Sequence, residues 1–148
     1  MSEASTLSVL KYLYDHPIKI YCFNGLPFKE RKKYIGYIYR VLEKIPDESR
    51  EKICKNCAVY VVDNFFGLHL NKSDKEIIIL NWFQMLFERV PRKEILFTVA
   101  HEFAHSVLKH RELTKGMQKV LGIDQEKEAD DLALEWGFSK PDRKINGS

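Results

Sequence analysis

Residues 94–110 read EILFTVAHEFAHSVLKH, and this stretch decides how the rest of the chain is interpreted. Apolar residues occupy most of the helical circumference across it, which predicts a buried helix from Pro91 to about His110. Two histidines and a glutamate fall inside that apolar span, at positions 101, 105 and 102. Polar groups in a protein interior are unfavourable unless a partner satisfies them. A metal ion would be such a partner.

The spacing of these three residues is typical of a metallopeptidase. His101 and His105 are four residues apart, so on a helix they lie about 40° apart around the axis and one turn apart along it. Two imidazoles in that relation can bind one zinc ion. Glu102 flanks the same face, where it can reach a zinc-bound water without being a ligand. We therefore predict His101 and His105 as zinc ligands and Glu102 as the catalytic base that activates the water.

A catalytic zinc needs a third protein ligand and one open position. Residues 124–137 predict a last helix, with an aspartate as N-cap, a glycine as C-cap and an apolar stripe of Ala129, Leu132, Ala133 and Trp136. Glu126 borders this stripe, and we predict it as the third zinc ligand. Asp130, one turn further on, is predicted to accept the free ring N–H of a ligand histidine. Glu128 and Asp131 are expected to face water, and His110 projects about 140° away from His105, which argues against it as a ligand.

The remaining patterns predict an α+β fold. Helices are expected at 3–14, at 26–45 and from 46 to about 55, followed by a strand at 58–62. The apolar runs 66–70 and 76–80 flank a polar turn, so they are interpreted as an antiparallel pair. The expected architecture is N-terminal helices, a small mostly antiparallel sheet, a buried active-site helix and a C-terminal ligand helix. One domain, 1–148, comprises a mainly helical part at 1–57, the sheet and active-site helices at 58–138, and a loose tail at 139–148.

One of these strands is predicted to bind substrate. We hypothesise that Phe66, Gly67, Leu68, His69 and Leu70 form an edge strand, to which an extended substrate adds beside the zinc. Gly67 would let another backbone approach closely. In the alternative, Gly67 only allows the backbone of a β-bulge, and the strand is covered by other parts of the protein and does not bind substrate. Candidates for stabilising the oxyanion of the reaction are His69, Tyr60 and the 111–123 connection.

Composition excludes several classes of protein. Hydrophobic residues make up 45% of the 148 residues and charged residues 30%, as in soluble globular proteins. A net charge of +3 is too balanced to indicate direct nucleic-acid binding. There is no secretory signal pattern and no apolar run long enough for a membrane helix, so a cytoplasmic protein is expected. Three cysteines suggest reduced thiols; the Cys54–Cys57 spacing fits half a zinc knuckle or a redox pair, but structural cysteines are favoured.

These residues together resemble the gluzincin group of metallopeptidases and, within it, the ImmA/IrrE-type metallopeptidases. The matching segments are 77–81, 97–105 and 126–133, although Asp130 stands where that family usually has asparagine. The resemblance implies a minimal zincin-like fold and limited proteolysis of a specific intracellular protein, often a transcriptional regulator encoded as a separate chain. The alternative is a zinc-binding, zincin-fold regulatory or protein-interaction module without turnover. The intact Glu102 favours the peptidase.

Overall fold

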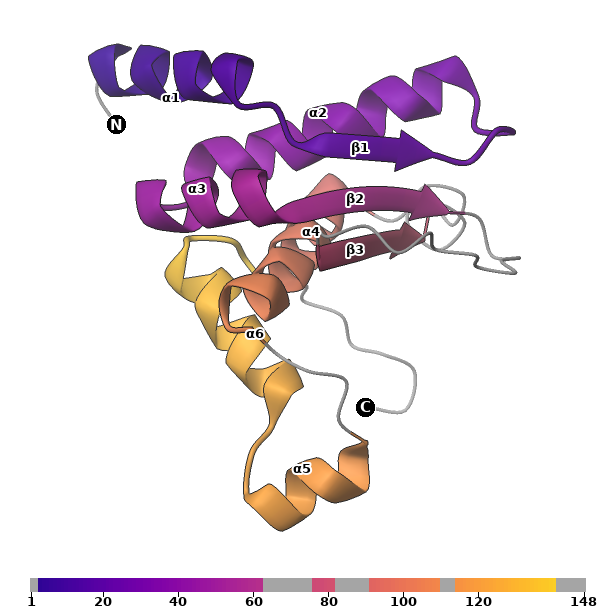
Figure 1. Ribbon diagram of the computed structural model, residues 1–148, viewed down its shortest axis with the longest axis vertical. Helices are drawn as coiled ribbons and strands as arrows, with labels where there is room; N and C mark the ends of the chain where they lie inside the picture. Colours follow the sequence, from indigo (N-terminus) through magenta and orange to yellow (C-terminus); the bar gives the residue numbers. More distant parts are fainter. Residues whose placement is uncertain (1–2, 63–75, 82–90, 110–113, 141–148) are drawn as a thin grey trace.

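The computed structural model describes residues 3–62, 76–81, 91–109 and 114–140 and has the α+β character that the sequence predicts (Figure 1). The described helices and strands follow the expected order, with two additions, β1 and α5. In chain order they are α1 (Glu3–Asp15), β1 (Lys19–Cys22), α2 (Phe28–Lys44), α3 (Asp47–Asn56), β2 (Cys57–Val62), β3 (Glu76–Asn81), α4 (Arg92–Val107), α5 (Lys115–Leu121) and α6 (Gln125–Glu135).

The three described strands form a parallel sheet in the order β1-β2-β3. Lys19 pairs with Ala58 at the start of the first ladder, and Cys57 pairs with Glu76 at the start of the second. The prediction of a mostly antiparallel sheet is therefore wrong for the described strands. The predicted partner of β3, residues 66–70, lies outside the described residues.

The burial of β2 explains why the parallel arrangement suits this sequence. Five of its six residues are buried, and Tyr60 is half-buried. A strand covered on both faces is typical of parallel sheets and needs a near-continuous apolar run, which residues 57–62 supply. Helices α2 and α3 make the connection between β1 and β2 that a parallel pair requires (Figure 1).

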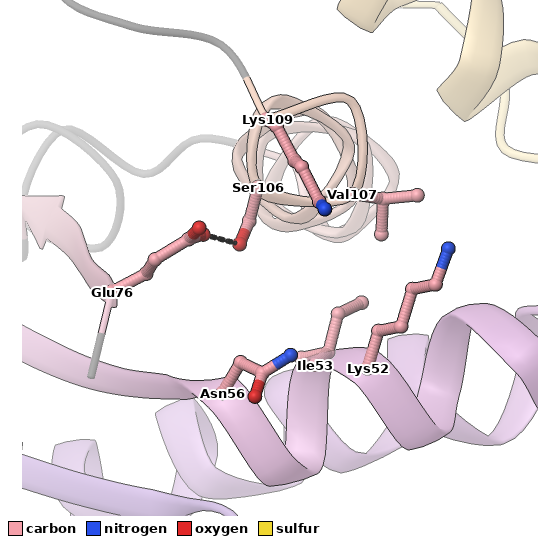
Figure 2. Close-up of a pocket in the computed structure, with 7 residues that line it drawn as sticks. All are labelled: Lys52, Ile53, Asn56, Glu76, Ser106, Val107 and Lys109. Atoms are coloured by element: carbon pink, nitrogen blue, oxygen red, sulfur yellow. Dashed lines mark hydrogen bonds between the residues drawn. The ribbon is translucent and has the colours of Figure 1, made fainter. Parts of the chain in front are cut away.

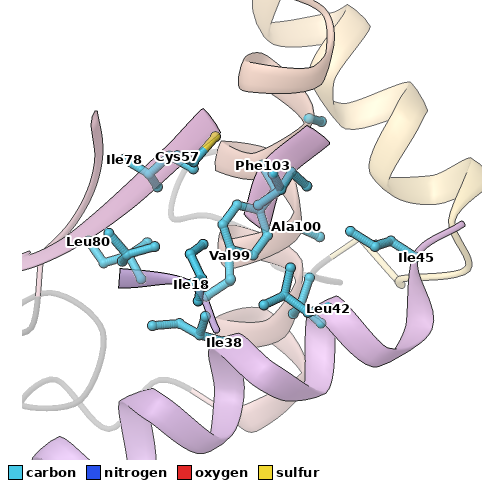
Figure 3. Packing of buried hydrophobic residues seen from close by; sticks show 14 of the residues in the cluster. Ile18, Ile38, Leu42, Ile45, Cys57, Ile78, Leu80, Val99, Ala100 and Phe103 are labelled. Carbon is cyan, nitrogen blue, oxygen red and sulfur yellow. The ribbon is translucent and has the colours of Figure 1, made fainter. Parts of the chain in front are cut away.

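Helix α4 lies at the centre of the fold and packs against α2, α3, α6 and β3. Figure 3 shows Val99, Ala100 and Phe103 of α4 facing Ile38 and Leu42 of α2 across the core. All five side chains have exposed fractions of 0%. The predicted burial of the helix that carries the histidines is confirmed, and the core fixes the rotation of α4 about its axis.

The C-terminal helices extend from the α4 side of the molecule, with α5 farthest from the sheet (Figure 1). Helix α6 begins as predicted, because Asp124 Oδ1 accepts a hydrogen bond from the backbone N–H of Lys127 at 3.1 Å. It ends before Gly137, whose φ of +95° favours glycine. No helix among the described residues is both long and apolar enough to cross a membrane.

Candidate metal and catalytic site

The core packing of α4 leaves one half-buried flank, which carries His101, Glu102 and His105. The Nε2 atoms of the two histidines lie 3.0 Å apart, with the rings edge-to-face. This follows from their positions one turn apart on one helix. The sequence predicted this pairing from spacing alone, and the structure brings the two nitrogens together.

Helix α6 supplies a carboxylate to the same point. Glu126 Oε2 lies 3.0 Å from His101 Nε2, and Glu126 Oε1 lies 3.1 Å from His105 Nε2. The close approach of α6 to α4 depends on the buried alanines Ala129 and Ala133, both 0% exposed, which let the two backbones approach. A larger side chain at either alanine would move Glu126 away from the histidines.

The geometry of these three donors fits a zinc ion. Their ligand atoms lie within 4.8 Å of one another, and they are the only such group found among the described residues. Ligands of tetrahedral zinc, at 2.0–2.2 Å from the ion, lie roughly 3.4 Å from each other. The observed separations of 3.0–3.1 Å differ from that by a few tenths of an ångström. Two imidazole nitrogens and one carboxylate are also a donor set that zinc prefers.

Asp130 holds the other side of the His101 ring. His101 Nδ1 lies 2.7 Å from Asp130 Oδ1, and a Nδ1–H donor there leaves the Nε2 lone pair directed at Glu126 and His105. Asp130 Oδ2 in turn lies 3.4 Å from the ammonium nitrogen of Lys140. The neighbouring Asp131 is exposed and pairs with Lys127 instead. A carboxylate behind a histidine in this way fixes the ring orientation.

Glu102 faces an open cleft of about 290 Å³ between β3 and α4. The cleft is lined by Glu76, Ile77, Ile78, Glu102, His105 and Ser106. Burial raises the pKa of the Glu102 carboxyl above its ordinary value; the nearby His101 opposes this shift, and Glu126 adds to it. A carboxylate with a raised pKa is a better proton acceptor than an exposed one.

Other predicted site residues have different outcomes. Phe66, Gly67, Leu68, His69 and Leu70 lie outside the described residues, as does His110, so the substrate-strand hypothesis stays a prediction. Tyr60 pairs with Tyr21 at a ring-centroid distance of 4.9 Å, on the sheet face opposite Val59 and Val61. That orientation disfavours Tyr60 as the oxyanion-stabilising residue. Glu76 and Ser106, which line the cleft, were not predicted.

A family model described as Peptidase U49 matches residues 87–146. This similarity supports a peptidase. The matched region contains α4, α5 and α6, and therefore all of the residues that converge around His101. No curated protein and no solved structure matches the chain.

Proposed function

We propose that this chain is a zinc-dependent endopeptidase that hydrolyses a peptide bond in a specific protein. The observation that carries the proposal is the convergence of His101, His105 and Glu126 at separations of 3.0–3.1 Å, with Glu102 beside them on an open cleft. The similarity of residues 87–146 to a peptidase family supports it independently. The substrate would be a protein or peptide, for example a separate regulator protein.

In this proposal His101, His105 and Glu126 would hold the zinc, while Asp130 and Glu102 have separate roles. When bound, zinc would supply a Lewis acid that polarises the scissile carbonyl and makes water more acidic. Asp130 keeps His101 oriented by accepting its Nδ1–H. The Glu102 carboxylate accepts a proton from the attacking water and then delivers it to the nitrogen of the leaving amine.

The cleft determines how a substrate reaches these groups. Because it runs between β3 and α4, an extended peptide lying in it would pass Glu102 and His105. We propose a cytoplasmic location, because Cys22, Cys54 and Cys57 are thiols that form no disulfide, as expected in a reducing compartment.

Removal of metal tests the proposal directly. We expect the purified protein to cleave an unstructured substrate such as casein, and cleavage to fall to the level of the buffer control after treatment with a chelator. Adding back about one equivalent of zinc per chain should restore it, because the ligands are already preorganised. Gel electrophoresis of the casein fragments measures the result. Undiminished cleavage by metal-free protein would contradict the proposal, whereas zinc binding without cleavage of casein or of any protein in the native cell extract would favour the non-catalytic zinc module.

A further inference from the structure

Glu76 places a negative charge in the cleft that the proposed chemistry does not use. It begins β3, and strand alternation puts it on the same face as Ile78 and Leu80, which are buried against the α4 side of the sheet. Its carboxylate therefore points toward α4, where it accepts a hydrogen bond from the Ser106 hydroxyl. Figure 2 shows this side chain reaching across from β3 to the helix.

The hydrogen bond with Ser106 orients the Glu76 carboxylate toward α4. Ser106 Oγ, its hydrogen-bond donor, also lies 2.9 Å from Cys57 Sγ at the start of β2. Cys57 is only 1% exposed, so this contact ties Ser106 to the core of the sheet. A carboxylate that is oriented before the substrate binds loses less conformational entropy on binding than one on a freely rotating side chain.

Among the described residues, no lysine or arginine forms a salt bridge with Glu76. The salt bridges of the described residues do not include Glu76, although Glu76 also lines a second, smaller pocket together with Lys52 and Lys109 (Figure 2). Lys52 pairs with Glu48 at 3.7 Å instead. On the cleft side the described lining holds two carboxylates, those of Glu76 and Glu102, and neither lysine nor arginine. Glu76 therefore contributes a negative charge to the described lining of the cleft, and this charge can attract a cation.

The position of Glu76 relates it to the reacting bond. Ser106 follows His105 directly and lies four residues after Glu102, so Ser106 and Glu102 are about 5–6 Å apart on one helix face. The Glu76 carboxylate, which contacts Ser106, therefore lies on the same side of α4 as Glu102, the proposed base. A cleft of about 290 Å³ has room for one long side chain at this point.

We propose that Glu76 determines specificity by binding the lysine or arginine side chain of a residue that flanks the scissile bond. This inference rests on the proposed peptidase function and adds a substrate class to it. Attraction of a cation and repulsion of an anion both contribute to such a preference. Ile77 and Ile78, which also line the cleft, would contact the methylene groups of the lysine or arginine.

Peptides that differ at single positions test the specificity. The substrates are a set of peptides in which each residue flanking the scissile bond is varied in turn. At one of these positions, we expect the parent protein to cleave the lysine or arginine peptide with a kcat/KM about tenfold higher than the leucine peptide. Glu76→Gln should abolish this preference while keeping an acceptor for Ser106, and Glu76→Lys should reverse it toward glutamate. Glu135→Gln is the matched control, because Glu135 is exposed at the end of α6 and does not line the cleft. Equal preference in the parent and Glu76→Gln would overturn the inference and leave the proposed peptidase standing.

A binding measurement separates the two proposals if cleavage is too slow to follow. Zinc-loaded Glu102→Gln protein should bind a fluorescent lysine-containing peptide about tenfold more tightly than the same peptide with leucine. Adding Glu76→Gln should remove the difference. If the difference in affinity is seen but the parent cleaves neither peptide, the proposal that Glu76 binds basic side chains stands and the peptidase proposal fails. If both peptides bind alike, or neither binds, the proposal for Glu76 is contradicted.

Discussion

Replacing Glu102 by glutamine is expected to lower kcat/KM for peptide hydrolysis by about 100- to 10,000-fold, because an amide cannot accept the proton from water. Glutamine has nearly the same shape, and Glu102 is not one of the three converging donor residues. The variant should therefore keep about one zinc per chain and the unfolding temperature of the parent. Initial rates of cleavage of a quenched fluorescent peptide measure kcat/KM. Zinc content and unfolding temperature are measured on the same samples.

Glu128→Gln is the matched control for this experiment. It makes the same chemical change at an exposed position on α6, where the sequence places the side chain away from the histidines. Its rate should stay within about twofold of the parent rate. A Glu102→Gln protein that keeps its zinc and cleaves as fast as this control would remove Glu102 from the reaction.

Replacing Arg50 by leucine is expected to lower the free energy of unfolding by about 3 kcal/mol. Arg50 is only 3% exposed and caps the end of α2. Its Nε donates to the carbonyl of Leu42 at 2.6 Å, and Nη2 donates to the carbonyl of Ile45 at 2.6 Å. These carbonyls belong to the last turn of α2 and the residue after it, where helix carbonyls lack partners within the helix. Leucine would leave them buried without donors.

Arg40→Leu provides the comparison for this stability measurement. Arg40 lies on the same helix but is exposed, so its replacement should change the unfolding free energy by no more than about 0.5 kcal/mol. Urea unfolding followed by circular dichroism, at a fixed zinc concentration, measures both variants. Equal losses in the two variants would show that the contacts of Arg50 with α2 do not determine the stability.

The helices could be predicted largely because their signals are local. Pro27, Pro46 and Pro91 immediately precede α2, α3 and α4, and Asp124 and Gly137 bracket α6. The convergence of His101 and His105 is likewise a property of one helix. The approach of Glu126 could be anticipated because the small alanines of α6 mark the face that packs closely.

The sheet was harder to predict, because an apolar strand does not reveal its direction. A polar turn at 71–74 suggested a hairpin for residues 66–80, and β1 was missed because it has only four residues. The near-continuous apolar run of β2 was a signal for a parallel sheet, because it favours a strand that is covered on both faces. Helix α5 was missed because it buries no residue, although Thr114 and Gly122 carry start and stop signals.

The cleft itself could not be predicted from the sequence. Glu76 and Ser106 are 30 residues apart and belong to different elements, and no periodicity connects them. They meet because β3 packs beside α4 in the folded chain. Residues that contact one another only through tertiary packing leave little trace in a single sequence. The contact between Glu76 and Ser106 was therefore missed, even though the spacing of His101, Glu102 and His105 was visible in the sequence.

The central claim, that His101, His105 and Glu126 hold zinc, is tested most directly by the zinc content of purified variants. Mass spectrometric metal analysis should find about one zinc per chain in the parent and in Glu128→Gln. His101→Ala, His105→Ala and Glu126→Gln should each lose most of it, because each removes one of the three donors that converge within 4.8 Å. Equal zinc in all five proteins, or loss in Glu128→Gln rather than Glu126→Gln, would contradict the account.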